Sequence, residues 1–110
     1  MLNFNDNILD TVERNGHMVY FIMTVGPSSG TRHLGYYTTR SEARQSILDN
    51  WCDMFEDGYY QHAAIIEAHS GLYPDLRITE WFEYNEVQMR GVHIDTAPDY
   101  VDQASFYFFG

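Results

Sequence analysis

The sequence predicts an α+β fold: a single antiparallel sheet of 4–5 strands in β-β-α-β-β order, with one main helix packed on one face. Two observations predict it. Segments rich in β-branched and aromatic residues flank one long helical pattern, and turn residues separate the segments of each pair. A length of 110 residues suffices for one modest core, so residues 1–110 are interpreted as a single domain.

The first half begins with a short helical pattern and a hairpin. Residues 8–12 place Ile8, Leu9 and Val12 at helical spacing. Residues 18–26 (MVYFIMTVG) are too short for a buried helix and predict a strand buried on both faces. The polar loop 26–30 (GPSSG) then leads into a predicted return strand at 33–38.

The strongest pattern is a helix over residues 40–57. Thr39 and Glu42 form the S/T-x-x-E capping box that starts a helix, and Gly58 supplies a left-handed stop. Between them an apolar stripe recurs at i, i+4, i+8, i+11 and i+12, made of Ala43, Ile47, Trp51, Met54 and Phe55. This stripe predicts a helix that packs on the sheet.

The second half predicts strands at 59–69 and 77–85, and a short one at 92–95. In the strand at 77–85, a period of two separates two faces. One face would hold Ile78, Glu80, Phe82 and Tyr84, and the other Thr79, Trp81, Glu83 and Asn85. Because neither face is purely apolar, we expect an edge strand or one covered only in part.

The charge is negative and unevenly distributed. The formal net charge is −10, all six basic residues are arginine, and thirteen of the sixteen acids lie in residues 41–110. Such a field repels nucleic acid and anionic membranes and attracts basic surfaces. Phosphate contact needs clustered Lys or Arg, so we expect neither direct nucleic-acid binding nor membrane binding.

The single cysteine and the absence of long apolar runs predict a cytoplasmic protein. Cys52 has no partner for an intrachain disulfide, which fits a reducing compartment. No apolar run approaches the length of a membrane span, and the first residues lack the features of a signal peptide.

The patterns associated with catalysis and metal binding are weak. Cys52 follows Trp51 in the helical pattern with no histidine on its face, and Glu80 and Glu83 point to opposite faces of a strand. The five histidines form no metal-ligand motif. We therefore expect a protein that is not an enzyme and that uses no metal or cofactor.

Acidic side chains in the predicted helix form the first candidate site. Asp49, Asp53 and Asp57 fall at i, i+4 and i+8, and Glu56 adjoins them. Acids in the last turns of a helix oppose its dipole, each costing about 0.3–1 kcal/mol. A chain optimised for stability alone would not place them there, which favours a functional acidic surface over one that only adds solubility. Both interpretations remain open at this stage.

The second strand pair extends this candidate surface. Glu80 and Glu83 would add charge, and aromatic residues beside them would anchor a partner. The predicted partner-binding aromatics are Trp81, Tyr84 and Tyr73.

An alternative site would bind an anionic ligand. Arg32, Arg40 and Arg44 lie near the start of the predicted helix, where guanidinium groups and the helix N-terminus favour anions. This alternative predicts a protein that binds or sequesters a nucleotide signal, with an oligomeric form compatible with that role.

Three stretches also carry a family pattern. The matching residues are Gly35, Tyr36, Thr39, Glu42 and Ala43, then Ala64, Ile66, Glu67, Gly71, Leu72, Tyr73 and Pro74, then Trp81 and Phe82. Over residues 18–110 the chain resembles a group of small uncharacterised proteins from bacteriophage and mobile-element genomes. The resemblance implies a phage accessory protein and brings no assigned activity, ligand or catalytic residue.

Charge and resemblance together predict a non-catalytic acidic interaction protein. By analogy with anti-restriction and anti-CRISPR proteins, we expect a phage-type inhibitor that occupies a basic nucleic-acid-binding surface of a host defence protein, such as a CRISPR effector. It would act in the host cytoplasm, and a homodimer is compatible with this role. Its affinity would fall steeply with added salt.

Overall fold

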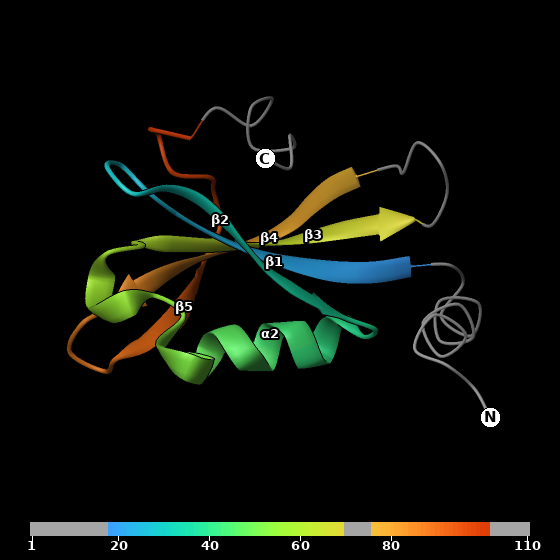
Figure 1. The fold of residues 1–110 in the computed structure, drawn as a ribbon, viewed down its shortest axis with the longest axis horizontal. Helices are drawn as coiled ribbons and strands as arrows, with labels where there is room; N and C mark the ends of the chain where they lie inside the picture. Colours follow the sequence, from blue (N-terminus) through green and yellow to red (C-terminus); the bar gives the residue numbers. More distant parts are fainter. Residues whose placement is uncertain (1–17, 70–75, 102–110) are drawn as a thin grey trace.

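The computed structural model describes residues 18–69 and 76–101. They form one antiparallel five-stranded sheet in the order β2-β1-β3-β4-β5, with a helix across one face (Figure 1). The strands are β1 (Met18–Gly26), β2 (Gly30–Tyr37), β3 (His62–His69), β4 (Leu76–Asn85) and β5 (Arg90–Ile94). The helix is α2 (Arg40–Leu48), and two 3-10 turns follow it, η1 (Trp51–Asp53) and η2 (Glu56–Gly58). The predicted α+β fold is confirmed.

The sheet has an apolar layer on each face. Under α2, a core cluster includes Ile47, Phe55 and Phe82, each with no exposed surface. On the opposite face, Met23, Ile66 and Trp81 form a second cluster. Because the central strands β1 and β3 are covered on both faces, they contain runs of buried residues, as the continuous apolar run at 18–26 predicts.

The predicted helix over 40–57 is too long, and this expectation is wrong. α2 begins as expected, with the Thr39 hydroxyl accepting from the amide of Glu42 at 3.2 Å, but it ends at Leu48. Asn50 adopts the left-handed conformation (φ 49°), which asparagine tolerates, and its side-chain oxygen accepts from the amide of Phe55 at 3.2 Å. Two tight turns then carry Met54 and Phe55 into the core and leave Trp51 64% exposed.

The predicted faces of the strand at 77–85 are correct for only part of β4. The β3–β4 register shifts between Ile65 and Ile66, which pair with Glu80 and Ile78, so Thr79 is an extra residue in β4. The Thr79 hydroxyl donates to the carbonyl of Ile65 at 3.3 Å. Beyond this bulge the alternation is inverted, and Ile78 packs with the cluster opposite α2 instead of beside Phe82.

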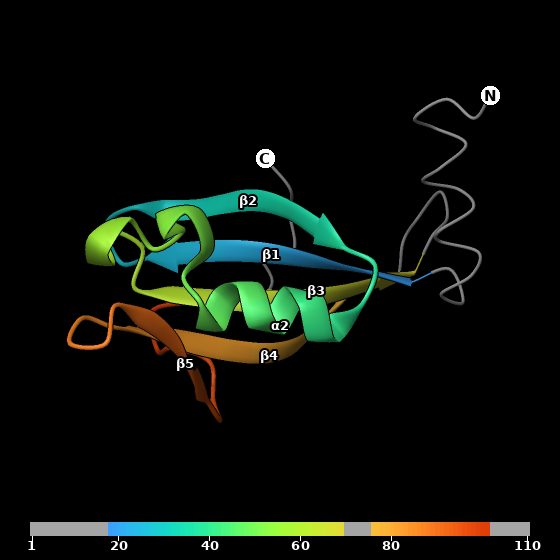
Figure 2. The same cartoon turned by 90° about the horizontal axis from the view of Figure 1, so that it is seen from below.

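The sheet has β2 and β5 at its edges, so β4 is an interior strand (Figure 2). The alternative of an edge strand is therefore wrong, and β5 pairs with the second half of β4, Trp81–Asn85. The helical pattern at 8–12 and the candidate anchor Tyr73 lie outside the described residues.

Candidate functional site

One end of the molecule collects carboxylates that have no arginine partner within residues 18–69 and 76–101. We call it the acidic end and define it by four exposed residues, Asp53, Asp57, Glu83 and Glu86. They come from the turns after α2 and from the end of β4. A hollow of about 300 Å³ lies between three of them and is lined by Asp57, Gly58, Gln61, Glu83, Tyr84 and Glu86. Among the described residues, no arginine forms an ion pair with any member of the acidic end.

Tyr84 ties the two parts of the acidic end together. Its ring packs on Phe55 in the core, and its hydroxyl donates to Asp57 at 3.3 Å. Burial, followed by the nearby carboxylates of Asp57, Asp53 and Glu86, raises the pKa of Tyr84. The hydroxyl therefore stays protonated and remains a donor to Asp57.

His62 leaves the charge of Glu83 uncompensated at neutral pH. The His62 Nε2 atom lies 3.8 Å from Glu83, but burial lowers the pKa of His62 more than Glu83 raises it. The other ring nitrogen, Nδ1, lies 2.6 Å from the hydroxyl of Tyr100, whose pKa is raised to about 12 mainly by burial. This pair joins the segment after β5 to the start of β3, with neither group charged at neutral pH.

Exposed apolar side chains border the acidic end. Val87 and Met89, in the β4–β5 turn, are 91% and 61% exposed, and Trp51 is 64% exposed. The side chain of Asn50 donates to the carbonyl of Met89 at 3.4 Å, which holds the turn containing Trp51 against the β4–β5 turn. Glu86 of the acidic end thus shares the β4–β5 turn with the exposed side chains of Val87 and Met89. Sequence reasoning missed Trp51, Glu86, Val87 and Met89 as candidates, although the polar turn after β4 was a signal for exposure.

The predicted acidic ridge on one helix does not form. Asp49 caps the C-terminus of α2, whereas Asp53 and Asp57 lie in the turns and have positive φ. Asp53 accepts from the amide of Asp57 at 3.2 Å, so the two carboxylates belong to a folded turn and not to a helix face. The argument from the helix dipole therefore does not apply to Asp53, Glu56 and Asp57.

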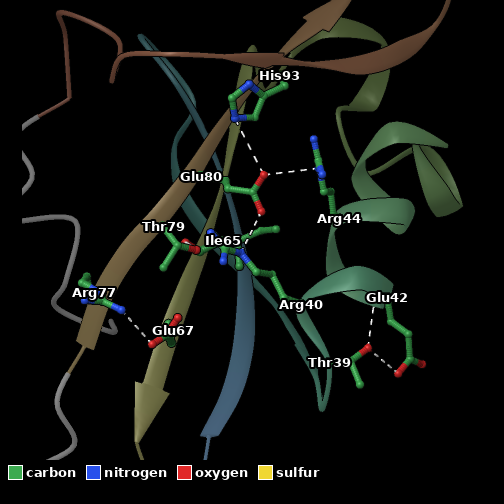
Figure 3. A network of polar contacts seen from close by, with 10 residues as sticks. All are labelled: Thr39, Arg40, Glu42, Arg44, Ile65, Glu67, Arg77, Thr79, Glu80 and His93. Atoms are coloured by element: carbon green, nitrogen blue, oxygen red, sulfur yellow. Dashed lines mark hydrogen bonds and ion pairs between the residues drawn. The ribbon is translucent and has the colours of Figure 1, made fainter.

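Glu80 is not part of the acidic end. Its side chain is only 9% exposed; it accepts from the Nε atom of Arg40 at 3.1 Å and forms an ion pair with the Nε atom of Arg44 at 3.3 Å (Figure 3). His93 lies 3.7 Å away on β5. The carboxylate faces α2 from the sheet and connects the start of the helix to β4.

Replacing Glu80 by glutamine is expected to lower the free energy of unfolding by about 1–2 kcal/mol. Removing one partner of a buried ion pair is strongly destabilising, but Arg40 and Arg44 are about half exposed and regain water, which reduces the loss. Glu83→Gln is the control, since Glu83 is 59% exposed. Urea unfolding should show a change within about 0.5 kcal/mol for the control. Equal effects of the two substitutions would contradict the assignment of Glu80 as a structural link.

Two further arginines, Arg77 and Arg32, are also engaged. Arg77 donates to Glu67 at 3.0 Å, directly across the β3–β4 pair. Arg32 forms an ion pair with Glu56, donates to the carbonyl of Met54 at 2.7 Å, and stacks 4.3 Å from the centre of the Tyr60 ring. Four of the six arginines thus neutralise three carboxylates outside the acidic end.

These contacts correct two sequence-based expectations. Arg32 is held by the turns after α2 and does not join Arg40 and Arg44, so the predicted three-arginine ligand site does not form. Trp81 and Tyr84 are 7% and 9% exposed, because they belong to the two apolar layers. The most exposed aromatics among the described residues are Trp51 and Tyr59, at 64% and 59%.

The comparisons with protein-family models, curated proteins and solved structures returned no match. Within residues 18–69 and 76–101, no group of three or more His, Cys, Asp and Glu side chains is arranged to hold a metal ion. The same residues include no helix with the length and apolar character of a membrane span. Cys52 is exposed in η1, with a positive φ of 53°.

Proposed function

We propose that this chain is a non-catalytic interaction protein whose acidic end occupies a basic, nucleic-acid-binding surface of a partner protein. The observation that carries the proposal is the clustering of Asp53, Asp57, Glu83 and Glu86, next to exposed apolar side chains and with no arginine partner in the described part of the chain. A surface that served solubility alone would need no large apolar groups at its border.

The two kinds of side chain have separate roles in this proposal. Unpaired carboxylates attract a basic surface over a Debye length of about 8–10 Å and accelerate association. Met89 belongs to a residue type enriched at interfaces, and its burial in the complex slows dissociation. An inhibitor of a nucleic-acid-binding defence protein, which we expect by analogy with anti-restriction and anti-CRISPR proteins, is a protein of this kind.

The partner class is argued from charge. A basic groove that normally holds nucleic acid presents several cationic groups to a row of phosphates. Carboxylates from two turns and a strand end, spread around the hollow at Tyr84, offer a comparable set of negative charges on a rigid support. Nucleic acid and this chain would then compete for the same groove.

The proposal is tested with proteins retained from a nuclease-treated host extract on the immobilised chain at low salt. Each retained protein is purified, and its Kd is measured with the wild-type chain and with Asp57→Asn/Glu86→Gln. We expect the double variant to weaken binding by about tenfold or more, because it removes two charges from the acidic end. A short DNA duplex should displace the wild-type chain from the partner.

The matched control is Glu42→Gln/Asp95→Asn. It removes the same formal charge from two exposed residues outside the acidic end, and we expect its Kd to stay within about twofold of wild type. If the two double variants weakened binding equally, the effect would depend only on the net charge of the chain. That result would reject the acidic end as the binding surface. A Kd that does not change between about 50 and 300 mM salt would reject the charge-based mechanism.

A further inference from the structure

The outer edge of β2 is an exposed strand edge. β2 pairs with β1 on one side, and within residues 18–69 and 76–101 no strand pairs with its other side (Figure 2). Six of its eight residues are exposed, including Leu34 and Tyr36 at 39% and 38%. A strand edge of this length presents a row of backbone donors and acceptors that another strand can pair with.

β2 carries few of the features that prevent edge pairing. Proteins protect strand edges with lysine, proline, inward-pointing charge or short strands. β2 has no proline, lysine or acid, and its one charged side chain, Arg32, is engaged by Glu56. One irregularity is present, a register shift opposite Ile22 and Met23. The other edge strand, β5, is better protected, because it has only five residues and begins with Arg90.

The charge distribution favours a second copy of this chain as the partner of the β2 edge. Residues 18–41 contain no acid, although the whole chain has a net charge of −10. Two copies of such a chain repel each other wherever their acids approach, and β1 with β2 is the longest acid-free part of the described sheet. A second copy can therefore approach this edge without opposing another carboxylate-bearing strand.

An apolar hollow beside β2 adds contact area. Its volume is about 530 Å³, and it lies between β2 and the turn after α2, lined by Ile22, Arg32, Leu34, Gly35, Tyr36, Tyr37, Ser46, Trp51, Cys52 and Met54. The exposed ring of Trp51 stands on one wall and Leu34 on the other. Large apolar side chains at the rim of an open strand edge are typical of an interface.

We propose that two copies of this chain pair antiparallel through β2, which joins two five-stranded sheets into one continuous sheet. The pairing is isologous, so the same strand edge serves both copies about a two-fold axis. The axis reverses the strand direction between copies and places their two acidic ends at opposite ends of the joined sheet. This pairing does not depend on the acidic end binding a partner.

The salt dependence of self-association distinguishes the proposed dimer from the proposed complex with a basic partner. Screening reduces the repulsion between two chains of charge −10, so added salt strengthens self-association. The proposed binding to a basic partner responds in the opposite direction. Sedimentation equilibrium at several protein concentrations, at low and high salt, measures the dimer Kd directly. We expect a lower Kd at high salt, and a monomer at every concentration and salt level would overturn the proposal.

Leu34→Glu tests the location of the interface, and Val87→Glu is its control. Each adds one negative charge at an exposed apolar residue, on β2 and on the β4–β5 turn respectively. We expect Leu34→Glu to weaken the dimer at least about tenfold and Val87→Glu to leave the dimer Kd within about twofold. Equal weakening by both, or weakening by Val87→Glu alone, would overturn the assignment to β2.

Hydrogen exchange of the wild-type chain tests the same interface without a substitution. In the dimer the outward amides of β2 donate to the second copy, so their exchange should slow as the protein concentration rises. Exchange in β5 should not change with concentration. Slowing confined to β5 or to the acidic end would overturn the proposal even if a dimer forms.

Discussion

Phe55→Ala is expected to lower the free energy of unfolding by about 3–5 kcal/mol, the range for a fully buried phenylalanine. Phe55 has no exposed surface and packs against the ring of Tyr84, with ring centres 5.2 Å apart. Its removal leaves a cavity between the turns after α2 and the sheet.

Trp51→Ala is the matched comparison, because the sequence pattern places both aromatics on one helical stripe. In the structure Trp51 is 64% exposed, so its loss should change the stability by no more than about 1 kcal/mol. Urea unfolding of the two variants, at a concentration where the chain is monomeric, gives both values. A large loss for Trp51→Ala would restore the continuous helix over 40–57 and contradict the observed turns.

The contrast between these two residues explains where sequence reasoning failed at the helix. The start of α2 could be predicted, because Thr39 and Glu42 form a local capping motif. The end depended on Asn50 entering the left-handed conformation and on its side chain bonding the amide of Phe55. Apolar periodicity cannot distinguish a helix from two tight turns that return residues to the same core, as Met54 and Phe55 do here.

The strands were more predictable than their faces. The apolar run at 18–26 coincides with β1, since burial on both faces requires apolar residues throughout. In β4 the extra residue Thr79 inverted the alternation, and nothing local marks a bulge at that point. Ile78 and Glu80 therefore appeared to share a face, although one packs opposite α2 and the other contacts Arg40.

The acidic character of the candidate site was predictable, but its members were only partly so. Charge counts locate the surplus in residues 41–110. Which carboxylates are neutralised depends on contacts between distant parts of the chain, such as Glu80 with Arg40 and Arg44. Glu86 joined the site because the β4–β5 turn meets the turns after α2.

Gly91→Ala is expected to cost about 3 kcal/mol or more, at or above the upper end for overpacking a core. Gly91 is buried in β5, where α2 ends directly above the sheet. A Cβ atom at this position would lie 2.7 Å from the carbonyl oxygen of Ile47, 2.8 Å from its Cγ2 atom and 3.2 Å from the ring of Phe55. The first contact is with backbone, so a change of side-chain rotamer cannot relieve it.

Gly30→Ala is the control that separates crowding from backbone strain. Gly30 has a φ of 75° and open space where a Cβ would stand, so alanine there should cost only about 1 kcal/mol. If Gly91→Ala were no worse than Gly30→Ala in urea unfolding, α2 would not lie as close to β5 as described. The double variant Gly91→Ala/Ile47→Ala gives a stricter test, because it removes the Cγ2 contact and keeps the carbonyl contact. We expect it to remain less stable than Ile47→Ala alone, since the distance between the helix end and the sheet is set by backbone atoms at both positions.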